Sequence, residues 1–299
     1  MSLTVRAWRA AAFVVLLLLP QQATAEGLRN GQGVLWQVMR DGKPAAHVFG
    51  TIHLADPDIV TLPAPVLSAF EKSTSLAVEA VLDDAATQVL AQAMALPADR
   101  SLQDLVPLDV FTKATMAAAP YGLQPAQLSR LKPWALAMLI TVPPDEIIRR
   151  SQGQPALDVF LTTRARQAGK PVRGLETMQE QIAVFDDLPQ DEQAAFLSAA
   201  AIDVQAKQQL MAAMKEAYLR RDLEAVRRAA QEGTPEAERE AADRLEHGLI
   251  DARNQRMVDR MTQSFDGGAF VAIGALHLPG DNGVLALLER QGYTLKRVY

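Results

Sequence analysis

The sequence predicts an α/β fold, with a mixed central sheet built from two βαβ-like units and a large helical insertion between them. Apolar runs with strand character lie near both ends of the chain, at 45–52 and 268–276, and each precedes a helical stretch and another strand-like run. Continuous apolar strands joined by a helix are typical of a sheet that is covered on both faces. Between the two units, from about 84 to 263, the apolar residues follow helical spacing.

The first 25 residues have the features of a secretory signal peptide. Arg6 and Arg9 precede an apolar stretch, and the small residues Ala23-Thr24-Ala25 suit signal peptidase. A membrane anchor is the alternative, but a span needs about 20 apolar residues and this stretch has roughly half as many. We therefore expect an exported protein, periplasmic or secreted, in which residues 26–299 form a single domain.

The composition excludes several classes of protein. The 299-residue chain has a formal net charge of −5, and removal of Arg6 and Arg9 with the leader would make it −7. An acidic chain without basic runs is not expected to bind nucleic acid or an anionic membrane surface. No later segment reaches spanning length without charges, so stable membrane insertion is not expected either. The chain has no cysteine, which excludes disulfides, thiolate metal sites and a cysteine nucleophile.

The N-terminal unit begins with a predicted hairpin. Two apolar stretches at about 34–40 and 45–52 flank Asp41-Gly42, a dipeptide that is typical of two-residue hairpin turns. A proline-bounded loop follows, and then a short helix at 64–72 and a strand, SLAVEAV, at 75–81. The order of this unit is therefore strand, loop, helix and strand.

The helical insertion is divided by prolines. Up to about residue 168 the chain is rich in Ala, Leu, Met and Gln, with prolines at 107, 120, 125, 133, 143 and 144. Gly169 is expected to end a helix, and KPVRGLE at 170–176 to form a strand. Helical spacing then resumes over about 177–263, with breaks near Pro189 and at Gly233-Thr234-Pro235.

The C-terminal unit repeats the order of the first. It has a strand, GAFVAIGAL, at 268–276, a helix, GVLALLERQG, that ends at Gly292, and a closing strand, YTLKRVY. In both units the first strand is followed by a histidine. This likeness of topology indicates two related units on either side of the insertion.

Two of the four histidines occupy the same local pattern. His53 and His277 each stand three residues after a glycine, Gly50 or Gly274, at the end of an apolar strand. Ligands of open α/β sheets bind outside the carboxyl ends of the strands, so the two histidines would face each other if their strands are neighbours. Two neutral imidazoles and a carboxylate form a common site for a catalytic divalent metal ion. The glycines would let a backbone or a ligand approach the strand end closely.

The other two histidines are expected to be structural. His47 lies six residues before His53 on the same strand, roughly 20 Å away, which is too far for both to bind one ion. His247 lies in a polar helical stretch, RLEHGL, and is expected at the surface or at a helix end.

Glu79 is the only charged residue in SLAVEAV, a stretch that otherwise reads as a buried strand. A buried carboxylate is costly unless it meets a cation, a metal ion or hydrogen-bond donors. It lies toward the same strand end as His53, which makes it a candidate metal ligand or the base that deprotonates the attacking water. The alternative is a buried salt bridge to an arginine.

Three further polar residues are weaker candidates by spacing alone. Glu176 closes VRGLE at another strand end, and Arg253 and Asn254 lie in the helical stretch GLIDARNQRMVDRM. The arginine could stabilise an oxyanion, or it could be the partner that neutralises Glu79 or Glu176. The chain contains no Gly-x-Ser-x-Gly elbow, Walker loop, dinucleotide fingerprint or His-Glu-x-x-His helix, which disfavours serine catalysis and nucleotide binding.

Several of these segments, in their order along the chain, resemble the TraB/GumN family. They are FGTIHL, LAVEA, LKPW, GLET, RN and GALHLPGDNGVLALLERQGYTLKRV, and the resemblance extends over about 34–299. The family is related to the Tiki proteins and, more distantly, to the erythromycin-esterase and ChaN-like superfamily. The resemblance implies an α/β core with a helical insertion and a metal-dependent hydrolase site.

The resemblance also implies roles for individual residues. The paired Gly-x-x-His motifs and a glutamate of the Tiki-type metalloprotease centre fall on His53, His277 and Glu79. The glutamate of the family's LET motif falls on Glu176, and its RN pair on Arg253 and Asn254.

The leading hypothesis is an exported metal-dependent hydrolase, specifically a peptidase, with a peptide or another small molecule as its substrate. His53, His277 and Glu79 would bind manganese, cobalt or zinc, the ions that the resemblance suggests, and Arg253 would steady the oxyanion. The alternative is a non-catalytic protein that binds haem or a peptide in the same cleft. A third possibility is that the cluster is a structural polar network.

Overall fold

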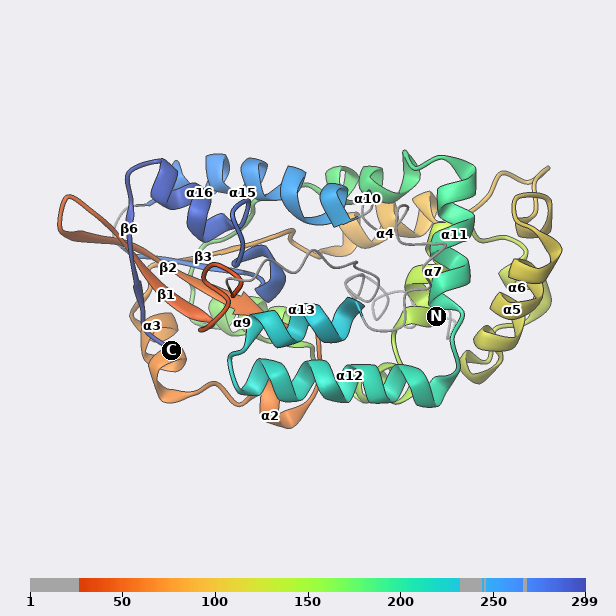
Figure 1. Ribbon diagram of the computed structural model, residues 1–299, viewed down its shortest axis with the longest axis horizontal. Helices are drawn as coiled ribbons and strands as arrows, with labels where there is room; N and C mark the ends of the chain where they lie inside the picture. Colours follow the sequence, from red (N-terminus) through yellow and green to blue (C-terminus); the bar gives the residue numbers. More distant parts are fainter. Residues whose placement is uncertain (1–26, 232–243, 245, 266–267) are drawn as a thin grey trace.

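A mixed sheet forms the centre of the computed structural model, which describes residues 27–231, 244, 246–265 and 268–299. Its strands are β1 (Leu35–Arg40), β2 (Lys43–Thr51), β3 (Ser75–Val78), β4 (Val172–Gly174), β5 (Ala269–Gly274) and β6 (Thr294–Arg297). They lie in the order β4-β3-β5-β2-β1-β6 (Figure 1). The predicted signal peptide and the predicted helix break at 233–235 lie outside the described residues, so both stay predictions.

The strand directions confirm the predicted α/β class. β1 pairs antiparallel with β2 and with β6, whereas β2 pairs in parallel with β5, β5 with β3, and β3 with β4. The predicted hairpin is also confirmed. Asp41 and Gly42 separate β1 from β2 and have φ angles of 51° and 74°. Two central residues with positive φ are typical of the type I′ turn, whose twist matches that of the strands.

Both predicted βαβ-like units are present. The first consists of β2, α3 (Ala64–Lys72) and β3, and the second of β5, α16 (Val284–Arg290) and β6. In each unit the two strands are parallel but not adjacent, because β5 lies between β2 and β3 while β2 and β1 lie between β5 and β6. The units therefore interleave, and this places β2 beside β5 in the middle of the sheet.

The predicted helical insertion is present between β3 and β5, and prolines begin several of its helices. Pro125, Pro133 and Pro144 each occupy the first turn of a helix, where a missing N–H costs nothing. Gly169, with φ of 70°, follows the helix that it was expected to end. Outside the sheet the described helices include α2 (Pro57–Val60), α4 (Asp84–Ala93), α5 (Leu108–Ala118), α6 (Pro125–Leu128), α7 (Pro133–Thr141), α8 (Pro144–Ser151), α9 (Leu157–Gln167), α10 (Met178–Asp186), α11 (Gln190–Ala200), α12 (Val204–Leu219), α13 (Leu223–Gln231), the π-helical turn His247–Asp251 and α15 (Ala252–Thr262).

Several strands are shorter than predicted, and in β3 and β4 the difference concerns the site. β3 ends at Val78, so Glu79 is the first residue after the strand rather than a residue within it. β4 likewise covers only Val172–Gly174, and Glu176 lies just beyond it. The backbone carbonyl of Glu79 accepts a hydrogen bond from the backbone N–H of Glu176 (2.7 Å). Both glutamates therefore leave the sheet together at its carboxyl edge.

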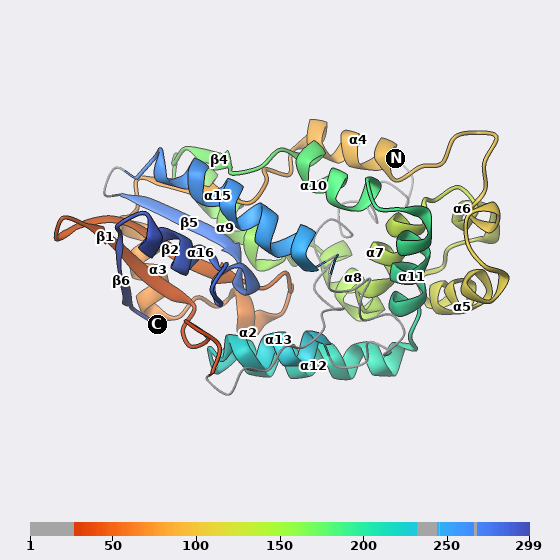
Figure 2. The same ribbon diagram turned by 45° about the horizontal axis from the view of Figure 1, so that its top comes forward.

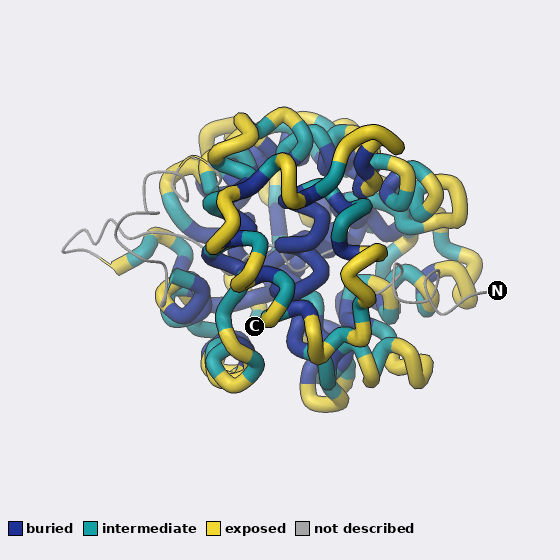
Figure 3. Tube along the Cα trace, turned by 90° about the vertical axis from the view of Figure 1, so that its right-hand side faces the viewer, coloured by how far each residue is buried: buried dark blue, intermediate teal, exposed yellow. Residues whose placement is uncertain are grey.

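Helices cover both faces of the sheet. α15 and α16 lie on one face and α3 and α9 on the other, while α5, α6, α7 and α11 gather at the far end of the molecule (Figures 1 and 2). In the middle of the molecule the chain is largely buried (Figure 3). There the ring of Phe270 contacts those of Phe49 and Phe70, with centroids 5.9 and 5.4 Å apart. The carboxyl ends of the parallel strands face the helical insertion. The candidate site lies between the sheet and the insertion.

Candidate functional site

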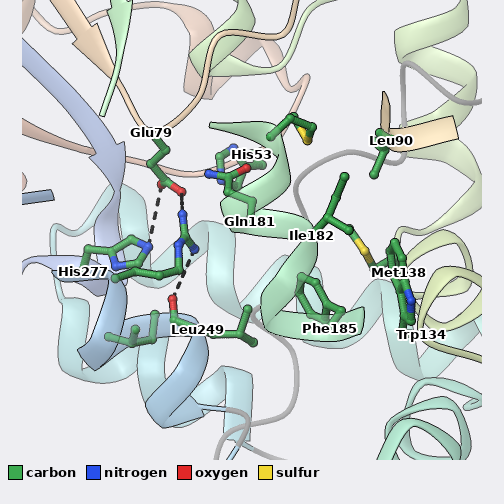
Figure 4. A pocket seen from close by; sticks show the side chains of 13 residues that line it. His53, Glu79, Leu90, Trp134, Met138, Gln181, Ile182, Phe185, Leu249 and His277 are labelled. Atoms are coloured by element: carbon green, nitrogen blue, oxygen red, sulfur yellow. Dashed lines mark hydrogen bonds and ion pairs between the residues drawn. The ribbon is translucent and has the colours of Figure 1, made fainter. Parts of the chain in front are cut away.

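The fold brings the two Gly-x-x-His motifs together. β2 and β5 are paired neighbours, with Thr51 opposite Gly274. His53 and His277 both line one pocket, which Glu79 and Arg253 also line. Figure 4 shows the side chains of Glu79, His53 and His277 close together at one end of this pocket. The sequence-predicted residues therefore converge at the carboxyl edge of the sheet.

His277 is fully buried and held by an amide. Its Nδ1 lies 2.7 Å from Oδ1 of Asn254, and Nδ2 of Asn254 donates to the carbonyl of Asn282 (2.8 Å). Since the amide oxygen is an acceptor, Nδ1 of His277 carries the proton and Nε2 has the lone pair. Nε2 lies 3.8 Å from Oε1 of Glu79. Burial lowers the pKa of His277 to about 3, so the ring is neutral at neutral pH.

His53 is held by a carboxylate that the sequence analysis did not single out. Its Nδ1 lies 2.9 Å from Oδ1 of Asp158, on α9. Burial alone would lower the pKa of His53, but the charge and hydrogen bond of Asp158 outweigh it, so that the pKa is raised. The backbone carbonyl of His53 accepts a hydrogen bond from Arg150 (2.5 Å). These contacts fix both the ring and the loop that carries it.

Glu79 is buried and engaged at both carboxylate oxygens. Oε1 accepts the backbone N–H of Gly274 (2.6 Å), and Oε2 accepts Nη2 of Arg253 (2.5 Å). Burial would raise the pKa of the carboxyl group, but the Arg253 guanidinium and the nearby histidines hold it well below its usual range. The open alternative of a buried salt bridge to an arginine is therefore realised in the structure. Glu79 is ionised at neutral pH.

Arg253 joins Glu79 to Glu176. Its Nε and Nη2 donate to Oε2 of Glu176 at 2.8 and 2.7 Å, and the other oxygen of Glu176 accepts Nη1 of Arg256 (2.9 Å). Both carboxylates raise the pKa of Arg253 against the effect of burial. Glu176 does not line the pocket of Figure 4, so it lies behind Arg253 as seen from the histidines. Asn254 likewise acts on the pocket through His277.

The glycines of both motifs are needed for close packing. A Cβ atom on Gly274 would lie 3.1 Å from Oε1 of Glu79 and 3.4 Å from Cδ2 of His277. A Cβ on Gly50 would meet the backbone of Ala275 at 2.9 Å. Gly274 therefore makes room for Glu79, and Gly50 lets the ends of β2 and β5 approach each other.

The helices that support His53 also carry a fully buried carboxylate, Glu146. Oε1 of Glu146 accepts the backbone N–H of Ala55 (2.6 Å) and Nε of Arg150 (2.8 Å). Arg150 in turn reaches the carbonyl of His53. Glu146 thus anchors the segment after β2. Its hydrogen bonds to Ala55 and Arg150 explain how a carboxylate can be buried away from solvent.

The two other histidines lie away from the pocket, as predicted. His47 is half-buried in β2 opposite Gln37, and burial lowers its pKa. His247 is exposed, and its ring lies 3.2 Å from Asp251 in the same helical turn. Over the described ranges, no helix combines the length and the apolar character that a membrane crossing requires.

The donor atoms suit a divalent ion in kind but do not form a ready site. Metal-binding histidines usually have one ring nitrogen fixed by a carboxylate or a carbonyl, and Asp158 and Asn254 hold the two Nδ1 atoms in this way. Yet among the residues that the structure describes, no three His, Cys, Asp or Glu side chains are grouped so that they could hold a metal ion. The fit lies in the donor types and their supporting contacts, not in a preassembled set of three ligands.

We expect the metal-free protein to lose stability as the pH falls below about 6.5, with His277 as one cause. Its pKa is about 3 in the folded chain and 6.5 without perturbation, so between these values only the unfolded chain takes up the proton. Stability therefore rises with pH over this window, by at most about 1.4 kcal/mol per pH unit from this group. Urea unfolding across the window measures the slope, which should be shallower in His277→Gln. An equal slope in both proteins would contradict the assignment.

Comparison with known proteins places these residues in a wider group. The model of the TraB/PrgY/gumN family matches residues 34–297. The metalloprotease TIKI1 of Homo sapiens is 26% identical over 312 residues, which cover 88% of this chain and 61% of TIKI1. The metalloprotease TIKI2 of Danio rerio is 25% identical over 317 residues, covering 88% of this chain and 60% of TIKI2. The protein of Escherichia coli (strain K12) named uncharacterized protein YbaP is 24% identical over 243 residues, which cover 81% of this chain and 87% of YbaP.

The chain spans about three fifths of the length of these TIKI proteins. No solved structure matches it. The family model covers the whole sheet and every residue that surrounds the two histidines, from Glu79 to Arg253. The chain therefore belongs to the TraB/PrgY/gumN family.

Proposed function

We propose that the protein is an exported metal-dependent hydrolase that cleaves peptides. The observation that carries the proposal is the meeting of His53, His277, Glu79 and Arg253 around one buried pocket. The names of the TIKI relatives, which are metalloproteases, point to the same reaction class.

The ion would be held by Nε2 of His53 and of His277, with Glu79 as the carboxylate ligand. Manganese, cobalt or zinc would polarise the scissile carbonyl and make water a better nucleophile at neutral pH. Glu79 is a weak base, because its pKa lies well below the usual range. Of its two predicted roles, that of a ligand and fixed negative charge is therefore the better supported.

Arg253 would stabilise negative charge on the substrate. It is a buried cation whose pKa is raised by Glu79 and Glu176, so it stays charged throughout the pH range of catalysis. A fixed charge in a pocket with little water stabilises an oxyanion far better than the same charge in solvent. Glu176 and Asn254 would position Arg253 and His277 without touching the substrate.

The metal content of the purified protein tests this proposal. After reloading with manganese, cobalt or zinc, elemental analysis should find close to one ion per chain in the wild type. A His53→Ala/His277→Ala variant should lose the ion while keeping its circular dichroism spectrum, because the imidazoles supply two of the ligands. A His47→Ala variant, altered in β2 away from the pocket, serves as the control. Absence of metal under every loading condition would sink the proposal.

A binding role without turnover is the second candidate. It is favoured by the pairing of both oxygens of Glu79 and by the lack of a three-ligand group among the described residues. The pocket next to the histidines has a volume of about 60 Å³, whereas a cavity of roughly 150 Å³ is needed to hold a benzene ring. The larger cavity that His53 and Glu79 also line has a volume of about 400 Å³, so under this alternative haem or a peptide would occupy the cleft formed by both cavities.

A further inference from the structure

Two cavities of different character meet at His53 and Glu79. The smaller, with a volume of about 60 Å³, is the one that also contains Arg253 and His277. The larger, of about 400 Å³, opens on the other side toward α4 and α9 and contains Asp158. His53 and Glu79 are the two residues that line both cavities. A molecule that occupies both cavities would therefore contact this pair.

The smaller cavity is apolar beyond its polar end. Its remaining walls come mainly from α7, α10 and the π-helical turn, and Gln181 of α10 also lines it. Figure 4 shows Ile182, Phe185, Met138 and Trp134 on the side away from Glu79. The apolar side chains that matter here are Trp134, Met138, Met178, Ile182, Phe185 and Leu249.

The size and polarity of this cavity restrict what it can hold. Its volume exceeds the roughly 10–15 Å³ that one water molecule needs and falls below the roughly 150 Å³ of a cavity that binds benzene. A branched aliphatic group of the size of a valine or leucine side chain fits between these limits. A charged group would be desolvated without a partner among the apolar walls, which is costly.

The larger cavity has a mixed lining in which polar groups are more prominent than in the smaller one. Thr87, Thr162 and Thr163 offer hydroxyl groups, and Asp83 and Arg166 offer charges of both signs. Thr51 also lines it, and its buried Oγ1 has no hydrogen-bond partner within the described residues. Such a surface suits the N–H and C=O groups of an extended peptide backbone, which need hydrogen bonds when they leave water.

We propose that the smaller cavity is a specificity pocket for an aliphatic side chain next to the scissile peptide bond. The larger cavity would receive the polar backbone of the rest of the substrate. The scissile bond would then lie next to His53 and Glu79, which line both cavities. This inference rests on the proposed hydrolase function and adds the substrate class to it.

Cleavage of short peptides tests the inference. Blocked pentapeptides, acetyl-Gly-Gly-Xaa-Gly-Gly-amide, with Leu, Phe or Asp at Xaa would be offered to the metal-reloaded protein. The value of kcat/KM should be at least about 10-fold higher for Leu than for Phe or Asp, since a hydrophobic pocket separates such side chains by roughly this factor or more. Equal values for the three peptides would overturn the inference.

Two variants on α10 sharpen this test. Ile182→Ala removes part of the wall, so the Leu-to-Phe ratio of kcat/KM should fall about 10-fold. Val184→Ala is the matched control, because Val184 lies two residues further along α10 and does not line the cavity. Its ratio should stay at the wild-type value. An unchanged ratio in Ile182→Ala would contradict the assignment of the cavity.

A binding measurement distinguishes a failure of this inference from a failure of the hydrolase proposal. Trp134 lines the cavity, so the Leu peptide should change its fluorescence, and the change should be absent in Trp134→Phe. If no peptide is cleaved but the Leu peptide still binds at least about 10-fold more tightly than the Asp peptide, the pocket assignment holds and the hydrolase proposal fails. If neither turnover nor binding prefers the Leu peptide, the pocket assignment is wrong.

Discussion

Replacing Arg253 by methionine is expected to lower the free energy of unfolding by about 3–5 kcal/mol. The change would leave Glu79 without its guanidinium partner, and within the described part of the chain Glu176 would keep the ion pair with Arg256 and the hydrogen bond from Gln181. Both carboxylates are buried, and a buried charge that loses its partner carries a desolvation cost with nothing to offset it. Equilibrium unfolding in urea at neutral pH measures the difference.

Two further variants separate a broken charge network from lost packing. Arg256→Met, one helical turn away on α15, removes a partly exposed guanidinium that contacts the same glutamate. Its effect should be about 1 kcal/mol or less, as for most exposed ion pairs. Arg253→Met combined with Glu79→Gln and Glu176→Gln removes the buried charges as well. This triple variant should recover part of the loss, and a loss as large as in Arg253→Met alone would show that packing, not charge, dominates.

The hairpin turn and several helix ends could be predicted because their signals are local. The Asp41-Gly42 turn, the glycine after α9 and the prolines that begin α6, α7 and α8 each act within a few residues. Whether β2 and β5 are neighbours was left open by the sequence, and the structure pairs them in parallel, which places their carboxyl ends at one edge. His53 and His277 therefore came together as their shared pattern suggested.

The partner of His53 could not be predicted, because Asp158 holds His53 from 105 positions away. Arg253 was a possible partner of Glu79 although it lies 174 positions away, but spacing alone could not choose between this role and the stabilisation of an oxyanion. In the sequence, an acid in the first turn of a helix reads as a partner of the helix dipole, so nothing distinguished Asp158. The available signal was that Asp158 is the only charged residue in ALDVFLTT, residues 156–163.

The apolar pocket was equally invisible in the sequence. Met138 and Ile182 are buried and stand at helical spacing among other apolar residues, so they read as ordinary core. A cavity arises where helices fail to close against each other, and this depends on how α7 and α10 meet the carboxyl edge of the sheet. The spacing of apolar residues along one helix does not show how closely that helix packs against the sheet.

Glu79→Gln is expected to lower peptide cleavage by at least about 100-fold while leaving the fold intact. Glutamine keeps the shape of the side chain and can still accept the N–H of Gly274, and Arg253 keeps Glu176 as a partner. What disappears is the negative charge between the two histidines and the arginine. Elemental analysis then distinguishes its two roles: a ligand takes the metal with it, whereas a base leaves the metal in place.

The pKa of Glu79 decides which of these results we expect. Arg253 holds the pKa of the Glu79 carboxyl far below its usual value. Glu79 therefore accepts a proton poorly and acts better as a fixed negative charge beside a cation. We therefore expect metal content and activity to fall together. Glu180→Gln is the matched control, because Glu180 pairs with Arg260 and caps α10 at Thr177, away from the pocket. Wild-type activity in Glu79→Gln would remove Glu79 from the reaction and leave its salt bridge as a purely structural feature.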